Sequence, residues 1–299
     1  MLKELIISIR PKQWYKNLVI FVCIVFSINL YNLDMWVDII AAFVIFCMLS
    51  GGEYIINDIL DVEKDKKHPR KSKRPIASGK LRVSNALSFA MLLVIVALVG
   101  AYLVTIKFLI ISIVFFLVML SYSLYLKRII IVDILVISVG FVIRAVAGCL
   151  AIDVTISPWL IICAFLLALF LALGKRRHEL VLLGEKAKAH RKILEGYSTH
   201  MLDQMINITT ATLIMSYSLY TFLYTFPDDK PPYMMFTIPL AIYGIFRYLF
   251  LVYSKTLGGE PELLFKDKGM LISMGLWAIL VFAILYGAMD IVIQFLEGI

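Results

Sequence analysis

The sequence predicts an all-α membrane protein with nine transmembrane helices. Of its 299 residues, 62% are hydrophobic, and the mean hydropathy is +0.92. This apolar share is well above the value usual for soluble domains. The apolar residues form recurring runs of about 20 residues, each long enough to cross a bilayer as a helix. Because the stretches between these runs are short, we expect one transmembrane domain over residues 1–299.

A basic amphipathic segment, residues 1–16, begins the chain. Its apolar and basic side chains separate onto two faces of a helix, with Leu2, Leu5, Ile6 and Ile9 on one face and Lys3, Arg10, Lys12 and Lys16 on the other. This pattern is typical of a helix lying on the membrane surface, and Pro11 is expected to end it. The first apolar run lacks the small-residue cleavage site of a signal peptide, so we expect it to be retained.

The apolar runs place the nine spans in order along the chain. We expect them at residues 17–33, 36–57, 85–105, 108–126, 131–152, 158–175, 203–226, 233–254 and 270–295. Charged connectors separate several of them, at residues 58–84, 126–131, 175–202 and 255–269.

The basic residues predict the orientation of these spans. If the amino terminus is cytoplasmic, all but three of the 29 Lys and Arg residues lie on the cytoplasmic side or before the first span. The exceptions are Lys107 and Lys230 on the opposite side and Arg144 within a span. By the positive-inside rule we expect a plasma-membrane protein with a cytoplasmic amino terminus and active site, and a carboxyl terminus outside. Although the net charge is +8, this one-sided distribution argues against nucleic acid as a partner.

The four cysteines all fall within apolar runs. Cys23, Cys47, Cys149 and Cys163 lack the spacing of metal ligands. We interpret them as small buried hydrophobes, and expect neither a disulfide framework nor a zinc site.

Several acidic residues lie at the end of the second span and just beyond it, within residues 53–82. On a helix, Asn57, Asp61 and Asp65 share one face, and Asp58 is next to Asn57. Oxygen ligands in this arrangement suit Mg²⁺, which binds one or two carboxylates and leaves positions for water and substrate phosphate. Placing carboxylates at the end of an apolar membrane helix costs free energy, so their presence favours a functional role.

A dense basic segment follows the carboxylates. Lys71 and Arg74 are among the cations that would attract an anion here. Carboxylates followed by cations predict a site for a metal-bound diphosphate. The competing interpretation is a solvated, charged connector between two membrane helices.

Several segments resemble a known family. Residues Asn57–Asp65, then His68-Pro69, then Arg74–Gly79 resemble the first aspartate motif of the UbiA superfamily of intramembrane prenyltransferases. Arg10–Asn17 and Gly174–Leu180 resemble one branch of it, the polyprenyl-phosphate phosphoribosyltransferases. The resemblance covers nearly the whole chain. It implies helices around a central cavity, a cytoplasmic cap of connectors, and a wall that opens toward lipid.

The resemblance also implies an activity. Members of this branch transfer 5-phosphoribose from phosphoribosyl diphosphate to a polyprenyl phosphate, with decaprenyl phosphate the expected acceptor, and release diphosphate. The expected metal ligands and catalytic residues are Asp58, Asp61 and Asp65, which would hold Mg²⁺. The acceptor phosphate is already anionic, so no general base is needed. A role in cell-wall biogenesis is suggested by the same branch.

The expected substrate-binding residues extend beyond this motif. They are Asn57, Lys16, Lys71, Arg74, Tyr122, Lys127, Arg144, Lys175, Arg176, Arg177 and Glu179.

Three of these groups have competing interpretations. At residues 175–177, three cations stand where other superfamily members carry a second aspartate-rich motif; this favours phosphate binding over ordinary positive-inside anchoring. Tyr122 and Lys127 fit either a site or an interfacial belt. Arg144 fits either the lipid phosphate or a structural ion pair with Glu53 or Asp133.

Two other functions remain open. A prenyltransferase that moves an isoprenoid from prenyl diphosphate to an aromatic or lipid acceptor would use the same first motif. A transporter for anionic lipid would place charge at mid-membrane and on both sides, whereas here the charge is one-sided. The bilayer is an expected partner in every case, and a homo-oligomer is compatible with the sequence.

Overall fold

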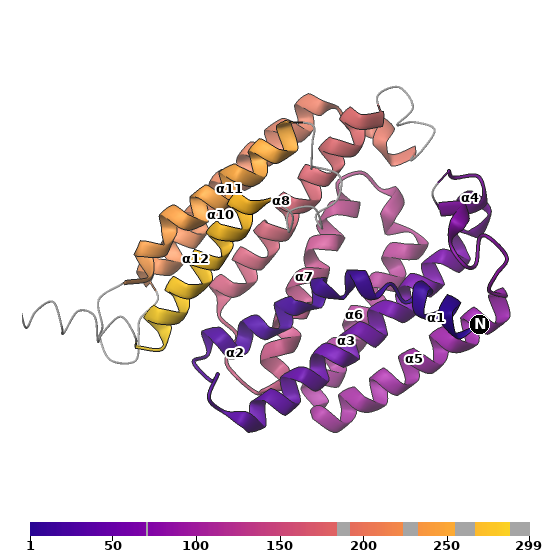
Figure 1. The fold of residues 1–299 in the computed structure, drawn as a ribbon, viewed down its shortest axis with the longest axis horizontal. Coiled ribbons are helices and arrows are strands. Elements are labelled where there is room, and N and C mark those ends of the chain that lie inside the picture. The colour runs from indigo at the N-terminus through magenta and orange to yellow at the C-terminus, as the bar shows by residue number, and fades with distance from the viewer. Residues whose placement is uncertain (70, 184–191, 224–232, 255–266, 288–299) are drawn as a thin grey trace, which may run out of the picture. The chain divides into compact units, whose positions relative to one another are not determined.

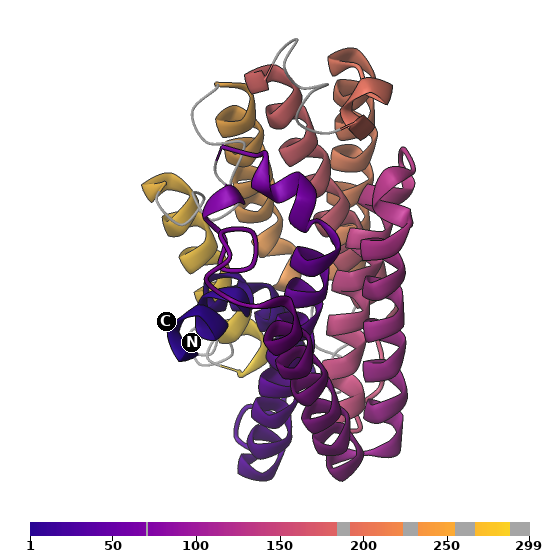
Figure 2. The same cartoon turned by 90° about the vertical axis from the view of Figure 1, so that its right-hand side faces the viewer.

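The computed structural model of the chain describes residues 1–69, 71–183, 192–223, 233–254 and 267–287. All regular secondary structure in these ranges is helical (Figures 1 and 2), which confirms the predicted all-α class. The chain divides into two compact units, Met1–Ile156 and Ser157–Ile299.

The first unit is built around the long helix α3 (Leu33–Leu60), which packs against α5, α6, α7 and η1. Its other elements are α1 (Leu2–Ser8), η1 (Pro11–Phe21), α2 (Val22–Phe26), α4 (Val62–Lys66), η2 (Lys71–Lys73), α5 (Val83–Val104), α6 (Ile106–Leu124), η3 (Leu126–Arg128) and α7 (Val132–Ala151). In Figure 1, α3 runs beside α5, and α4 stands at its carboxyl end. Asn32 begins α3 by accepting hydrogen bonds from the backbone N–H groups of Asp34 and Met35.

Small residues let the helices of the first unit approach closely. Ala86, Ala90, Ala97 and Ala101 on α5 are all fully buried. On α7, a Cβ atom at Gly148 would lie 2.2 Å from the carbonyl oxygen of Ile20 in η1. Small side chains are the usual means of close helix packing in membranes. The close approach of η1 to α7 therefore requires a glycine at position 148.

The second unit is a set of packed helices. It contains α8 (Pro158–Leu183), η5 (Lys192–Gly196), α10 (Thr199–Leu223), η6 (Tyr233–Thr237), α11 (Ile238–Tyr253) and α12 (Lys268–Leu285). α10 packs along α8, and α11 packs against both α10 and α12 (Figure 1).

Seven helices in the described residues are long and apolar enough to cross a membrane, so the predicted count of nine is not confirmed. The predicted span 17–33 is instead the 3₁₀ helix η1 followed by the short α2. Ile28 has a positive φ of 59°, and the chain turns there before α3 begins. The predicted span 203–226 corresponds to α10, which is long enough but less apolar than the seven. Residues 288–295 of the ninth predicted span lie outside the described residues.

The interpretation of all four cysteines as unpaired was wrong. Cys23 in α2 and Cys149 in α7 form a disulfide, with Cα atoms 5.2 Å apart. Cys47 and Cys163 remain thiols. Sequence spacing could not reveal the pair, because 126 residues separate its members and only the packing of α2 against α7 brings them together.

Candidate active site

The predicted line of carboxylates lies where α3 ends. Asn57 and Asp58 belong to its last turn, Asp61 caps it, and Asp65 lies in α4. The backbone N–H of Asp61 donates to the carbonyl of Asn57, and that of Asp65 donates to the carbonyl of Asp61, so successive turns carry the acids. Asp58 and Asp65 are buried.

One arginine joins the two buried carboxylates. Nη1 of Arg74 lies 2.9 Å from Oδ1 of Asp58 and 2.5 Å from Oδ2 of Asp65. Lys71 is the next cation, with its Nζ 3.9 Å from Oδ1 of Asp65. Because both acids reach the same nitrogen atom, their carboxylates converge on one point.

Arg10 also contacts Asp58, with 2.5 Å between its Nη2 and Oδ1 of Asp58. Sequence analysis assigned Arg10 to the surface helix and missed this role. Arg10 adopts a left-handed conformation, with φ of 52°, between α1 and Pro11, and its guanidinium lies over the ring of Tyr54. Its position directly before a proline was the local signal of a turn at this point.

A fourth cation comes from the connector after α6. Nζ of Lys127 in η3 lies 3.0 Å from Oδ1 of Asn57 and 2.6 Å from Oδ2 of Asp61. Lys127 is therefore part of the carboxylate cluster and not merely of an interfacial belt. Tyr122 lies half-buried in the last turns of α6, and Lys16 lies in η1.

Arg144 occupies a different environment. It is buried in α7, where its Nε donates to Oδ1 of Asn17 at 2.7 Å and its Nη1 donates to the carbonyl of Gly140 at 2.8 Å. The guanidinium also lies over the rings of Phe115 and Phe141. Within the described part of the chain, Arg144 is thus held by an amide, a carbonyl and two rings, and forms no ion pair with Glu53.

Three predicted residues of the second unit form ion pairs on α8 and α10. Nη1 of the buried Arg176 lies 2.8 Å from Oε2 of Glu179. Arg177 pairs with Asp203 at 2.5 Å and stacks over the ring of Tyr253, whose hydroxyl also donates to Asp203. Sequence analysis missed Asp203 and Tyr253. Lys175 lies in the same stretch of α8.

Asp267, which precedes α12, has a structural role. It accepts two hydrogen bonds from Arg247 and one from the backbone N–H of Met270. The Arg247 guanidinium, with help from that backbone N–H, lowers the pKa of Asp267 below its usual value. The ionised carboxylate caps α12.

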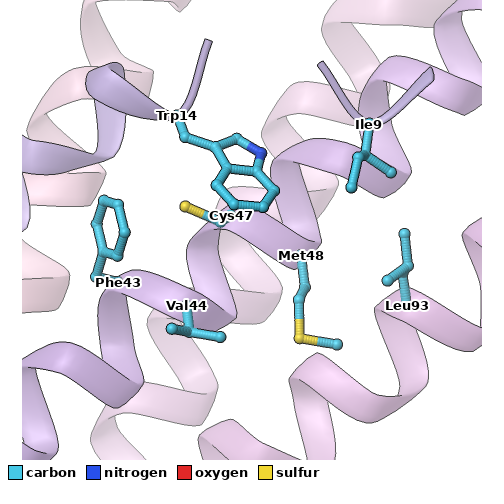
Figure 3. Close-up of a pocket in the computed structure, with 7 residues that line it drawn as sticks. All are labelled: Ile9, Trp14, Phe43, Val44, Cys47, Met48 and Leu93. Carbon is cyan, nitrogen blue, oxygen red and sulfur yellow. The ribbon is translucent and has the colours of Figure 1, made fainter. Parts of the chain in front are cut away.

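An apolar cavity of about 120 Å³ lies between η1, α3 and α5 (Figure 3). Its walls include Trp14, Phe43, Met48 and Leu93. In Figure 3 the Trp14 ring lies above Cys47. These side chains offer few groups that would bind phosphate. The candidate site for an anionic ligand in the first unit is therefore the end of α3.

The carboxylate cluster fits a hard divalent cation. Asp58 and Asp65 offer oxygen donors that converge on one nitrogen of Arg74, so a cation at that point would reach both. In the described residues no group of three or more His, Cys, Asp or Glu side chains converges into a cage. Mg²⁺ does not need one, because it is commonly held by one or two carboxylates together with substrate phosphates.

The chain is similar to known proteins along most of its length. The model of the UbiA prenyltransferase family matches residues 18–271. Decaprenyl-phosphate phosphoribosyltransferase of Mycolicibacterium smegmatis is 33% identical over 91% of this chain and 89% of its own. The Corynebacterium glutamicum protein of the same name is 31% identical over 93% and 86%. A UbiA homolog from Archaeoglobus fulgidus, solved with GPP and Mg²⁺, superimposes with a TM-score of 0.72 at 18% identity and covers 95% of this chain and 99% of its own.

Proposed function

The chain belongs to the UbiA prenyltransferase family, and from that premise we propose that it transfers 5-phosphoribose from phosphoribosyl diphosphate to a polyprenyl phosphate and releases diphosphate. The observation that carries the proposal is similarity along nearly the whole chain to two decaprenyl-phosphate phosphoribosyltransferases. Decaprenyl phosphate is the acceptor we expect. The reaction would take place at the cytoplasmic end of α3, in the plasma membrane.

The residues at the end of α3 suit this reaction. Asp58 and Asp65, with Asp61 between them in sequence, would hold Mg²⁺. When bound, Mg²⁺ would act as a Lewis acid that stabilises the charge of the departing diphosphate. The acceptor phosphate is anionic at neutral pH and needs no general base, which agrees with a cluster of acids paired to strong cations.

The cations of the cluster would change partners when substrate binds. Arg10, Arg74 and Lys127 now neutralise the carboxylates. Once a divalent cation takes those carboxylates, the same side chains would donate hydrogen bonds to phosphate oxygens. Such charge-assisted bonds are among the strongest that proteins form. In the second unit, Lys175, Arg176 and Arg177 would bind the 5-phosphate or the lipid phosphate.

One assay separates this proposal from its alternative. Purified protein in detergent is offered labelled phosphoribosyl diphosphate with decaprenyl phosphate and, in parallel, a prenyl diphosphate with 4-hydroxybenzoate. We expect product only from the first pair, loss of turnover in EDTA, and recovery with Mg²⁺. Consumption of the prenyl diphosphate alone would establish prenyl transfer instead, and undiminished turnover in EDTA would refute the metal requirement.

A further inference from the structure

Glu53 is a buried acid for which the described residues supply no partner. Only 5% of its surface is exposed, and no described residue forms a hydrogen bond with its Oε1 or Oε2. The four residues that precede Glu53 in α3, residues 49–52, are buried as well. A buried carboxylate without a partner is costly, and within a membrane span it marks a functional position by default.

A second orphaned group lies on the same face of α3. The hydroxyl of Ser50 is also buried, and it has no hydrogen-bond partner within the described ranges of the chain. From Ser50 the spacing to Glu53 and Asn57 is three and then four residues, which places all three on one helical face. Asn57 is the residue that accepts a hydrogen bond from Lys127 within the carboxylate cluster. A strip of unsatisfied polar groups therefore extends from that cluster by one to two turns of α3.

The chemistry of the strip selects its ligand. Two carboxylate oxygens without donors match two neighbouring hydroxyl groups, which a carboxylate binds with one hydrogen bond each. A phosphate group fits less well, since it would be repelled by the Glu53 carboxylate. A helical turn is about 5.4 Å long, which is comparable to the span of a ribose ring together with its hydroxyl groups. A sugar whose C1 diphosphate lies at Asp58 and Asp65 would thus bring its hydroxyls about one turn away.

We propose that Glu53, assisted by Ser50, binds the vicinal hydroxyls of the donor ribose and makes the enzyme select ribose over deoxyribose donors. The proposal rests on the proposed phosphoribosyl transfer and deepens it. Glu53 acts here as a specificity-determining residue and takes no part in breaking the C1 bond.

The test compares two donors and three proteins. The donors are phosphoribosyl diphosphate and its 2-deoxy analogue, and the proteins are wild type, Glu53→Gln and the control Glu63→Gln. Glu63 is an exposed acid on α4 that pairs with Lys66 at 2.6 Å. We expect Glu53→Gln to lose about tenfold or more in kcat/KM with the ribosyl donor, but less than about threefold with the deoxy donor. The control should keep the wild-type discrimination.

A stability measurement excludes a purely structural role. If Glu53 serves only substrate, Glu53→Met removes an unsatisfied buried acid and should raise the melting temperature of the ligand-free protein by about 2 °C or more. Equal losses for both donors in Glu53→Gln, or destabilisation by Glu53→Met, would overturn the inference while phosphoribosyl transfer stands. A wild type that ignores phosphoribosyl diphosphate would overturn both.

Discussion

Individual side chains at the end of α3 balance one another's charges. Asp58 is contacted by Arg10 and Arg74, and Asp61 by Lys127. Ion pairs that are buried repay their desolvation only when geometry and hydrogen bonding are good. Here Asp58, Asp61 and Asp65 each lie against at least one cationic side chain, so the three acids and their partners form one compact cluster.

Removing one of the converging acids should abolish the activity. We predict that Asp58→Asn lowers kcat/KM by about a hundredfold or more, because the divalent cation loses a charged ligand and the departing diphosphate loses stabilisation. The measurement is the phosphoribosyl transfer assay across a range of Mg²⁺ concentrations. Asp34→Asn, an exposed acid at the other end of α3, is the control. Normal turnover in Asp58→Asn would make the acid structural.

Lys127 offers a second test of the cluster. We predict that Lys127→Met lowers kcat/KM by about tenfold or more, since Asn57 and Asp61 lose their shared donor and the bound phosphate loses a cation. Lys107→Met removes an exposed lysine at the opposite end of α6, where it pairs with Asp153. If both variants show the same kinetics as wild type, Lys127 is only a membrane anchor.

At the scale of elements, close packing holds the site in register. η1 lies against both α3 and α7, and α5 lies along α3 through its alanines. Arg10 immediately precedes η1, and Lys127 lies in η3 after α6. The position of both cations therefore depends on how these elements pack.

Gly148 tests this packing directly. We predict that Gly148→Ala lowers the melting temperature by several degrees, because the new Cβ would lie 2.2 Å from the Ile20 carbonyl and must push η1 away from α7. Overpacking of this kind costs about 1–3 kcal/mol or more. Gly275→Ala, on α12, meets nothing within 4 Å and should be neutral or stabilising. Equal melting temperatures for the two variants would contradict the close approach.

At the scale of the whole molecule, long apolar helices and one-sided charge predict how the chain lies in a membrane. α3 carries Asp34 near one end and Lys64 just beyond the other, both exposed. If α3 spans the bilayer with the carboxylate cluster in the cytoplasm, these two positions lie on opposite sides.

Thiol labelling can check this orientation. We predict that an impermeant thiol reagent added to intact cells labels Asp34→Cys but not Lys64→Cys, and that inside-out vesicles give the reverse, because basic connectors stay cytoplasmic. The unmodified chain, whose remaining thiols Cys47 and Cys163 are not exposed, supplies the background. Labelling of Lys64→Cys in intact cells would invert the topology.

The disulfide joins two distant parts of the first unit. We predict that peptide mapping without reductant recovers Cys23 linked to Cys149, and that reduction lowers the melting temperature, since the bridge closes a long loop in the unfolded chain. The Cys23→Ser variant should melt at the temperature of the reduced wild type. Recovery of all four cysteines as thiols would exclude the bridge.

Local pattern alone determined much of this protein. Apolar runs predicted most of the helices, because a helix that crosses a bilayer must be apolar over its length. The spacing of the acidic motif predicted that Asn57, Asp61 and Asp65 share one helical face beside Asp58, and these residues lie at the end of α3 and in α4. The 3.6-residue period of a helix makes such spacing readable without a structure. The same reasoning failed at residues 17–33, where the 3₁₀ helix η1, the short helix α2 and a turn replace the expected span.

Only the tertiary structure decided which distant residues complete the cluster. Arg10 and Lys127 are 48 and 66 residues from the acids they contact, and 126 residues separate Cys23 from Cys149. Sequence also could not show that Glu53 lacks a hydrogen-bond partner in the part of the chain that the structure describes, or that Arg144 binds Asn17. Contacts of this kind depend on which helices pack together and on how they are aligned along their axes. The spacing of residues in a single sequence does not indicate either property.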